Sequence, residues 1–263
     1  MADRAKRIVV KVGTSTLTHP TGRSNIRAME NLVKVVSDIM NQGIQVALVS
    51  SGAIAVGVGK LRLPSRPKDT AGKQAAATVG QCELMFMYDK MFAEYGHKVG
   101  QLLITRQDVD DPLRHYNLVA CFDNLFAMGV LPIINENDAV AVEEIVYGDN
   151  DSLSAIVARL VHADTLIILS DIDGVYDGDP RLNPAAQRIP VVEEVTPHLR
   201  AACGGAGSDR GTGGMETKLR AAEHAMEAGI DTWVINGTPA ENIYLALDGA
   251  NIGTYFRGGT GDA

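Results

Sequence analysis

Short apolar runs alternate along the chain with longer segments in which apolar residues recur at helical spacing. The short runs predict buried strands, because they lack polar alternation and are bounded by turn residues. The predicted strands cover residues 7–12, 44–49, 99–104, 130–134, 165–169 and 232–235. The longer segments predict helices over residues 26–40, 73–95, 113–128, 152–161 and 215–228.

This alternation predicts an α/β fold, a three-layer αβα sandwich in which helices cover both faces of a mostly parallel central sheet. No repeat or low-complexity linker interrupts the pattern, so we expect residues 1–263 to form a single domain. Residues 173–192 depart from the rhythm and predict a small excursion, such as a hairpin.

Composition removes several classes of function. Hydrophobic residues make up 46% of the chain and charged residues 21%, which excludes a disordered protein. The formal net charge of −8 disfavours nucleic-acid and anionic-membrane binding, although a local basic pocket for a phosphorylated ligand stays open. Three cysteines without a CxxC pair, and no signal peptide, predict a cytoplasmic protein with reduced thiols. No membrane span is expected, since the longest charge-free run, residues 39–59, is broken by polar residues and glycines.

Candidate chemistry gathers where the predicted strands end. In open α/β sheets, ligands bind beyond the carboxyl ends of the strands. Four of these ends carry small, polar or glycine-rich segments, namely KVGTS at 11–15, SSGA at 50–53, NEND at 135–138 and SD at 170–171. One such end would be an ordinary turn, whereas four together predict a binding site.

Each of these segments has two interpretations. Lys11 lies in an apolar strand, and it either reaches the phosphates of a ligand or extends its ammonium group to solvent. The turn that begins at Ser51 either offers backbone N–H groups to an anion or is a simple serine N-cap. The polar residues between 135 and 151 grip an ammonium group, form a solvated acidic loop with an N-cap before Ser152, or bind Ca²⁺.

The glycine-rich segment 204–214 runs directly into the predicted helix that carries Lys218. A loop of this kind predicts a phosphate cradle, and the alternative is a flexible surface loop with Lys218 on a solvated helix face. The segment does not match GxxxxGK[ST], so a P-loop NTPase is excluded. HRD, DFG, HExxH and GxSxG strings are also absent from the sequence.

Five of these strings, in this order, resemble the motifs of the glutamate 5-kinases, a family within the amino acid kinase superfamily. They are KVGTS at 11–15, SGAIA at 51–55, NEND at 135–138, GDND at 148–151 and GTGGMETK at 211–218. The resemblance extends over nearly the whole chain, from about residue 8 to residue 256. It implies the amino acid kinase fold and transfer of the ATP γ-phosphoryl group to the side-chain carboxylate of L-glutamate, the first step of proline synthesis.

The resemblance also implies roles for individual residues. Lys11 and Lys218 would flank the transferred phosphoryl group as catalytic residues, and Asp151 would hold a lysine in place. Glutamate would be bound in the part from about 1 to 163, by Thr14, Ser51, Gly52, Asp138 and Asn150, with Asp138 facing its ammonium group. ATP would be bound mainly in the part from about 164 to 263, by Lys11, Ser170, Asp171, Thr212, Gly213, Gly214, Met215, Glu216, Thr217 and Lys218.

The remaining expectations concern partners and rivals. ATP is expected to bind with Mg²⁺, for which the sequence singles out no ligating protein residue, and proline is expected to be a feedback inhibitor. A homo-oligomer, a dimer or a tetramer, is expected, in a form without the C-terminal PUA domain of many relatives. The rivals are another member of the superfamily, such as an acetylglutamate or uridylate kinase, and a non-catalytic amino-acid sensor. Retention of both Lys11 and Lys218 speaks against a sensor, which has no phosphoryl group to neutralise.

Overall fold

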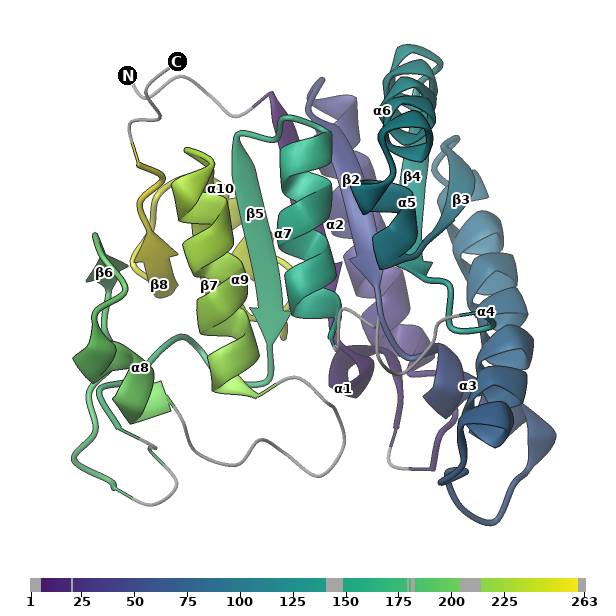
Figure 1. Cartoon of the computed structure of the whole chain (residues 1–263), viewed down its shortest axis with the longest axis horizontal. Coiled ribbons are helices and arrows are strands. Elements are labelled where there is room, and N and C mark those ends of the chain that lie inside the picture. The colour runs from purple at the N-terminus through teal and green to yellow at the C-terminus, as the bar shows by residue number, and fades with distance from the viewer. Residues whose placement is uncertain are drawn as a thin grey trace.

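The structure is a computed structural model that describes residues 6–19, 21–140, 149–178, 180, 183–203 and 214–259. Its strands form one eight-stranded sheet in the order β3-β4-β2-β1-β5-β7-β8-β6 (Figure 1). The strands are β1 (Arg7–Val12), β2 (Gln45–Ser50), β3 (Lys98–Ile104), β4 (Val130–Glu136), β5 (Thr165–Ser170), β6 (Val191–Val192), β7 (Asp231–Asn236) and β8 (Gly253–Phe256). Neighbouring strands are parallel except β7 and β8, which are antiparallel, so the mostly parallel sheet is confirmed.

Helices cover both faces of this sheet, as the sequence predicts (Figure 1). They are α1 (Thr14–Leu17), α2 (Ile26–Asn41), α3 (Ala53–Leu61), α4 (Thr70–Ala93), α5 (Arg106–Asp110), α6 (Pro112–Ala127), α7 (Asn150–Leu160), α8 (Pro197–Cys203), α9 (Met215–Glu227) and α10 (Asn242–Leu247). In β1, Ile8, Val10 and Val12 enter a core shared with α2, α4 and α10, whereas Val9 enters a core shared with α6, α7 and α9. The central strand is therefore buried on both sides, which explains its unbroken apolar run.

Every strand and long helix predicted from the pattern is present, with ends within three residues of the predicted ones. The short elements α1, α5, α8, α10, β6 and β8 were not predicted, and only the start of α3 was. The excursion at 173–192 contains an antiparallel bridge between Tyr176 and Arg188, and β6 then pairs parallel to β8. Elements of two to seven residues are too short to show a period of their own.

Glycines let α3 and α4 pack with their backbones in contact. A Cβ atom on Gly80 of α4 would overlap the carbonyl group of Ala53 in α3, and one on Gly57 of α3 would overlap the carbonyl group of Ala76 in α4. Only glycine fits at such an approach. This contact fixes the position of α3, whose first residue follows the turn at the end of β2.

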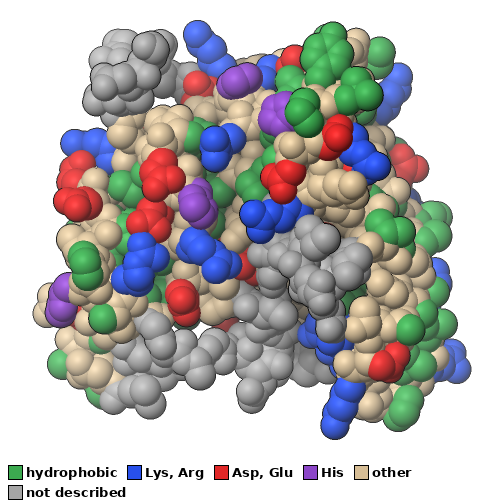
Figure 2. Space-filling view, in the orientation of Figure 1, with side chains coloured by type: hydrophobic (Ala, Val, Ile, Leu, Met, Phe, Trp, Pro, Cys, Tyr) green, Lys and Arg blue, Asp and Glu red, His purple; other side chains and the backbone are tan. Residues whose placement is uncertain are grey.

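Charged side chains of both signs lie on the surface. On the face shown in Figure 2, Lys and Arg side chains lie interspersed with Asp and Glu side chains. Ion pairs of this kind include Arg200 with Glu223 at 2.6 Å and Arg220 with Asp149 at 2.7 Å.

Within the part of the chain that the structure describes, no helix has the length and apolar character needed to cross a membrane.

Candidate active site

The polar strand ends meet at one edge of the sheet. β1 lies in the middle of the sheet, between β2 and β5, and runs parallel to both. The carboxyl ends of β1, β2, β4 and β5 therefore point the same way. Strand β2, which follows β1 in the chain, lies on one side of β1, and the later strand β5 lies on its other side. The strand order therefore reverses at β1, and the carboxyl edge at such a topological switch point is where α/β proteins bind ligands.

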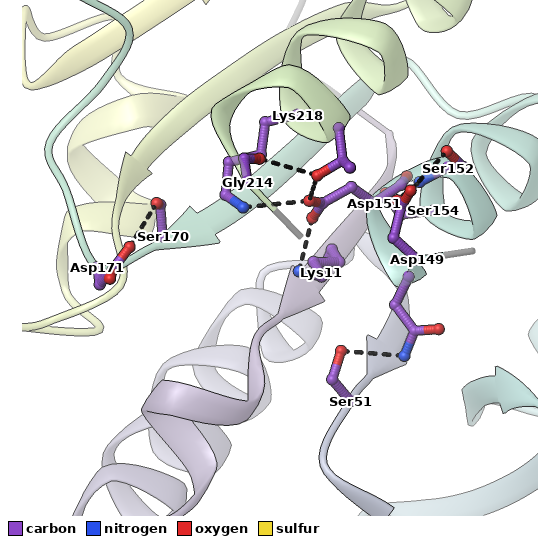
Figure 3. A network of polar contacts seen from close by, with 12 residues as sticks. Lys11, Ser51, Asp149, Asp151, Ser152, Ser154, Ser170, Asp171, Gly214 and Lys218 are labelled. Carbon is purple, nitrogen blue, oxygen red and sulfur yellow. Dashed lines mark hydrogen bonds and ion pairs between the residues drawn. The ribbon is translucent and has the colours of Figure 1, made fainter. Parts of the chain in front are cut away.

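Two lysines from distant parts of the chain converge on one carboxylate at this edge (Figure 3). Lys11 Nζ of β1 lies 2.6 Å from Asp151 Oδ1, and Lys218 Nζ of α9 lies 3.1 Å from Asp151 Oδ2. Asp151 stands in the first turn of α7. Three separate elements thus bring their charged groups to one point.

All three side chains are buried, since Lys11 is 6%, Lys218 7% and Asp151 0% exposed. The two alternatives in which either lysine is solvated are therefore wrong. Burial by itself raises the pKa of Asp151, but the neighbouring charges of Lys11 and Lys218, with hydrogen bonds from Lys11 and Thr217, lower it to about 2. The carboxylate is charged at neutral pH, and the three groups together carry a net charge of +1. Such a buried cluster attracts an anion.

Helix α9 presents its N-terminus to this cluster. Its N-cap is Gly214, which has no side chain to accept from the first-turn N–H groups. By contrast, Asn25, Asp69 and Asp111 cap α2, α4 and α6 with side-chain oxygens. Thr217 Oγ1 donates to Asp151 Oδ2 at 2.7 Å and so ties the first turn of α9 to the carboxylate. No described side chain caps this end, so its first N–H groups suit an anion, as at other helix N-termini that bind phosphate.

Helix α3 begins in the same way on the other side of β1. Its N-cap is Gly52, which adopts a left-handed φ of +94° and has no capping side chain. A Cβ atom at Gly52 would lie 3.7 Å from the Thr14 side chain, so the starts of α1 and α3 are neighbours. Ser51 is not the N-cap, and that alternative is wrong. Its Oγ instead accepts a hydrogen bond from Asn150 Nδ2 at 3.0 Å.

A relay of amide side chains sets the orientation of Asn150. Asn150 Nδ2 lies 3.0 Å from the carbonyl oxygen of Ser50 and 2.9 Å from Asn135 Oδ1. Asn135 Oδ1 also accepts from the backbone N–H of Glu136, and Asn135 Nδ2 donates to Gln81 Oε1 at 3.0 Å. A backbone carbonyl can only accept and a backbone N–H can only donate, so both amide orientations are determined. The Nδ2 group of Asn150 is occupied within the protein, whereas its Oδ1 atom has no hydrogen bond to another described residue.

The acidic segment after β4 divides into residues with different positions. Asp149 caps α7 by accepting from Ser152 N–H at 2.7 Å, so the N-cap alternative holds for this residue. Asp138 follows β4, is partly buried, and has no hydrogen bond or ion pair to another described residue. Burial raises the pKa of Asp138, and the charge of Arg66 lowers it by a smaller amount. Three or more His, Cys, Asp or Glu side chains in a metal-binding arrangement are not found within the described ranges.

Apart from Lys11, the described residues that are expected to bind ATP lie at the start of α9 and at the end of β5. Ser170 ends β5, on the other side of β1 from Ser51, and its Oγ lies 3.3 Å from Asp171 Oδ1 (Figure 3). Met215 and Glu216 form the first turn of α9, in which Glu216 is exposed. Thr212 and Gly213 lie outside the described residues, as do Gly148 and the rest of the glycine-rich segment up to 213.

The sequence pattern did not single out Gln81 and Tyr88 of α4. Gln81 is 9% exposed and begins the amide relay, and Tyr88 is fully buried with its Oη 2.9 Å from Ser50 Oγ. Both contact the ends of β2 and β4 from α4, whose sequence pattern is that of an ordinary helix packed against the core. A polar residue on the buried face of an apolar helix is the one signal that could have found them.

Comparison with known proteins agrees with this architecture. The model of the amino acid kinase family matches residues 6–236. Among solved structures, carbamate kinase from Giardia lamblia bound to AMP-PNP aligns with a TM-score of 0.69 at 14% identity, over 96% of this chain and 98% of that chain. UMP kinase from Bacillus anthracis aligns with a TM-score of 0.65 at 17% identity, over 99% and 98%. At such identities the likeness concerns the fold alone.

The sequence relatives are much more similar. Glutamate 5-kinase of Clostridium perfringens is 54% identical over 256 residues, which cover 96% of this chain and 95% of the relative. Glutamate 5-kinase of Clostridium acetobutylicum is 55% identical over 250 residues, covering 95% and 94%. That of Listeria welshimeri is 50% identical over 256 residues, covering 96% and 93%. This chain therefore belongs to the amino acid kinase family and, within it, to the glutamate 5-kinases.

Proposed function

We propose that this chain transfers the γ-phosphoryl group of ATP to the side-chain carboxylate of L-glutamate, which forms L-glutamyl 5-phosphate for proline biosynthesis. The observation that carries the proposal is the buried Lys11–Asp151–Lys218 cluster, placed at the carboxyl edge of the sheet in a chain 50–55% identical to glutamate 5-kinases. The relatives at 50–55% identity are glutamate 5-kinases, which favours this activity over those of an acetylglutamate kinase or a uridylate kinase.

The chemistry follows from charge. A side-chain oxygen of glutamate attacks the γ-phosphorus, the bond between that phosphorus and the oxygen bridging to the β-phosphate breaks, and ADP leaves with the bond electrons. A carboxylate has no proton to lose, so the step needs no protein base. Catalysis then depends on positioning and on neutralising the phosphoryl oxygens and the leaving group. Lys11 and Lys218 would supply that charge from two sides, with Asp151 holding both ammonium groups in place.

On the ATP side, the N–H groups of the first turn of α9, from Gly214 through Met215 and Glu216 to Thr217, would hold the phosphates, with the ammonium group of Lys218 beside them. Ser170 and Asp171 would border the nucleotide, and Thr212 and Gly213 would precede the turn. Mg²⁺ would arrive as part of the ATP substrate, with phosphate oxygens among its ligands. Asp151 suits it poorly as a ligand, because its two oxygens already contact the lysines. The part from about 164 to 263 would therefore be the ATP-binding part.

On the glutamate side, residues of the part from about 1 to 163 would bind different groups of the substrate. Thr14, Ser51 and the turn at Gly52 would bind the reacting carboxylate, next to the starts of α1 and α3. The Oδ1 atom of Asn150 and the carboxylate of Asp138 would accept from the ammonium group. A partly buried carboxylate that has no hydrogen bond or ion pair to another described residue, and whose pKa is raised by burial, gains charge stabilisation when a cation binds beside it.

Asp138→Asn tests this arrangement. The variant keeps the shape of the side chain and removes its charge, so we expect the KM for glutamate to rise roughly 10- to 100-fold, the effect of one lost charge-assisted hydrogen bond. The contact exists before and during the reaction, so kcat and the KM for ATP should change little. Steady-state kinetics with each substrate varied would measure this. Glu30→Gln, on the exposed side of α2, is the control, and a change confined to the ATP KM would contradict the assignment.

Gln81 is a positioning residue, because it acts on the substrate through Asn135 and Asn150. Gln81→Met removes the acceptor for Asn135 Nδ2, whereas Gln81→Glu keeps one. We expect Met to raise the glutamate KM roughly 3- to 10-fold with an unchanged ATP KM, and Glu to restore most of the loss. Equal effects of Met and Glu, or equal changes in both KM values, would show that Gln81 serves only packing.

Substrate choice is tested by measuring ADP release with L-glutamate, N-acetylglutamate and UMP as separate acceptors. We expect turnover with glutamate only, and turnover with UMP alone would overturn the proposal. Feedback inhibition by proline and a homo-oligomeric state stay predictions. Adding proline to the same assay, and light scattering of the purified protein, would check them.

A further inference from the structure

A cavity lies at the end of the strands opposite to the candidate active site. It has a volume of about 1050 Å³ and is bordered by the ends of α2 and α10 and by the starts of β5 and β7. Thr165, the first residue of β5, lines it, whereas Ser170, the last, lies at the candidate active site. Five residue steps along a strand span roughly 17 Å, so the cavity is separate from the Lys11–Asp151–Lys218 cluster. Its volume is at the upper end of the range of small-molecule sites.

Aromatic side chains form one wall of this cavity. Trp233 of β7 and Tyr255 of β8 are direct cross-strand partners, with ring centroids 5.0 Å apart. Both rings line the cavity, and Tyr244 of α10 lines it too. Neighbouring aromatic rings offer flat apolar area and a negative face, which together suit a cation with a flat or apolar body.

Carboxylates complete the lining. Tyr244 Oη donates to Asp38 Oδ2 at 2.8 Å, so this ring is held against α2. Tyr255 is hydrogen-bonded in the same way to Asp231, and burial first, then the carboxylate, raises its pKa to about 12, which keeps its hydroxyl a donor at neutral pH. Asp248 is the third acidic residue of the lining.

The charge of this lining is not balanced from within. Its described residues include three aspartates and neither Lys nor Arg. Two arginines reach its rim. Arg257 is paired with Glu193 at 3.1 Å, whereas Arg188 donates to neutral oxygens of Asn251 and Asp173 and keeps its charge, so the three aspartates of the lining still outnumber it. The cavity therefore favours a positively charged occupant.

We propose that this cavity is a binding site for a small organic cation, with an ammonium, amidinium or guanidinium group directed to Asp38 and Asp231 and its body against Trp233 and Tyr255. Each carboxylate has lone pairs left after its tyrosine is bound, and charge-assisted hydrogen bonds to such groups are the strong ones. The proposal is independent of the phosphoryl-transfer site.

The chain offers a direct measurement, because Trp233 is its single tryptophan. Tryptophan fluorescence and the one indole N–H signal in an NMR spectrum therefore report on this cavity alone. We expect benzamidine to cause a saturable change in both. Benzamide has nearly the same shape without the charge, and we expect it to bind at least about 10-fold more weakly.

Two variants and a control complete the test. Asp38→Asn and Asp231→Asn remove one charge each. One oxygen of Asp38 accepts from both Tyr244 and Gln42, so the Asn oxygen can replace it, whereas Asn at 231 keeps one acceptor for Tyr255 and the Gly258 N–H, and the unfolding midpoint of each variant would show that the fold persists. Each is expected to weaken benzamidine binding roughly 10-fold. Glu30→Gln, on the exposed side of α2, should leave it unchanged. Equal binding of benzamide and benzamidine, no saturable response, or unchanged binding by both Asn variants would overturn the proposal.

Discussion

Replacing Lys218 with Ala is expected to lower kcat by on the order of 10²–10³, the usual effect of removing one donor that stabilises transition-state charge. Lys218 is buried beside Asp151 at the start of α9, where an ATP γ-phosphate would meet the helix N-terminus. Its charge matters most when negative charge builds up on the phosphoryl oxygens and the leaving group. The KM values should change less than kcat, which initial-rate kinetics at saturating glutamate and ATP would measure.

The matched control is Lys34→Ala, which removes an exposed lysine from α2. It should leave kcat unchanged. Circular dichroism and the unfolding midpoint of Lys218→Ala would show whether the variant remains folded. An unchanged kcat in a folded Lys218→Ala protein would mean that the Lys11–Asp151–Lys218 cluster serves stability and not phosphoryl transfer.

The parts of the fold that repeat a period could be predicted from the sequence. Strand β1 is apolar on both faces because two helix layers cover it, and this made Lys11 stand out within it. The strand ends could be placed at one edge because parallel strands share a direction. The string that ends at Lys218 could be placed at a helix start because glycines precede it.

Other parts of the site depend on distances that spacing along the chain does not contain. Gln81 contacts Asn135 only because α4 crosses the ends of β2 and β4, and the close packing of α3 and α4 sets that crossing. The aromatic cavity exists because β8 returns antiparallel to β7, which brings Tyr255 opposite Trp233. Strand β8 has four residues, too few for a pattern to predict its direction.

Asp151→Asn is expected to destabilise the protein by about 3–5 kcal/mol, because it leaves two buried ammonium groups without their shared counter-charge. Both lysines are less than a tenth exposed, so water can replace little of the lost interaction. Urea unfolding at neutral pH would measure the difference, provided that the slope of the transition stays the same. A loss of activity with unchanged stability would show instead that the lysines find other partners.

The pH dependence of stability gives an independent check on the same carboxylate. The pKa of Asp151 is about 2 in the folded protein, against about 3.9 for an ordinary aspartate. Its lowered pKa therefore contributes stability, roughly 2–3 kcal/mol, that is present above about pH 4 and lost as the pH falls toward 2. Asp151→Asn lacks this contribution. The difference in the free energy of unfolding between the unchanged protein and this variant should therefore become smaller as the pH falls from about 4 toward 2.

The pairing itself is measured by combining Asp151→Asn with Lys218→Met. If the cost of Asp151→Asn comes from unpaired cations, removing one of them should relieve part of it, and the double variant should be more stable than the sum of the single effects predicts. The coupling should lie at about 0.5–3 kcal/mol, as for residues in one charged network. Additive effects would mean that Asp151 and Lys218 stabilise the fold independently, despite the 3.1 Å between them.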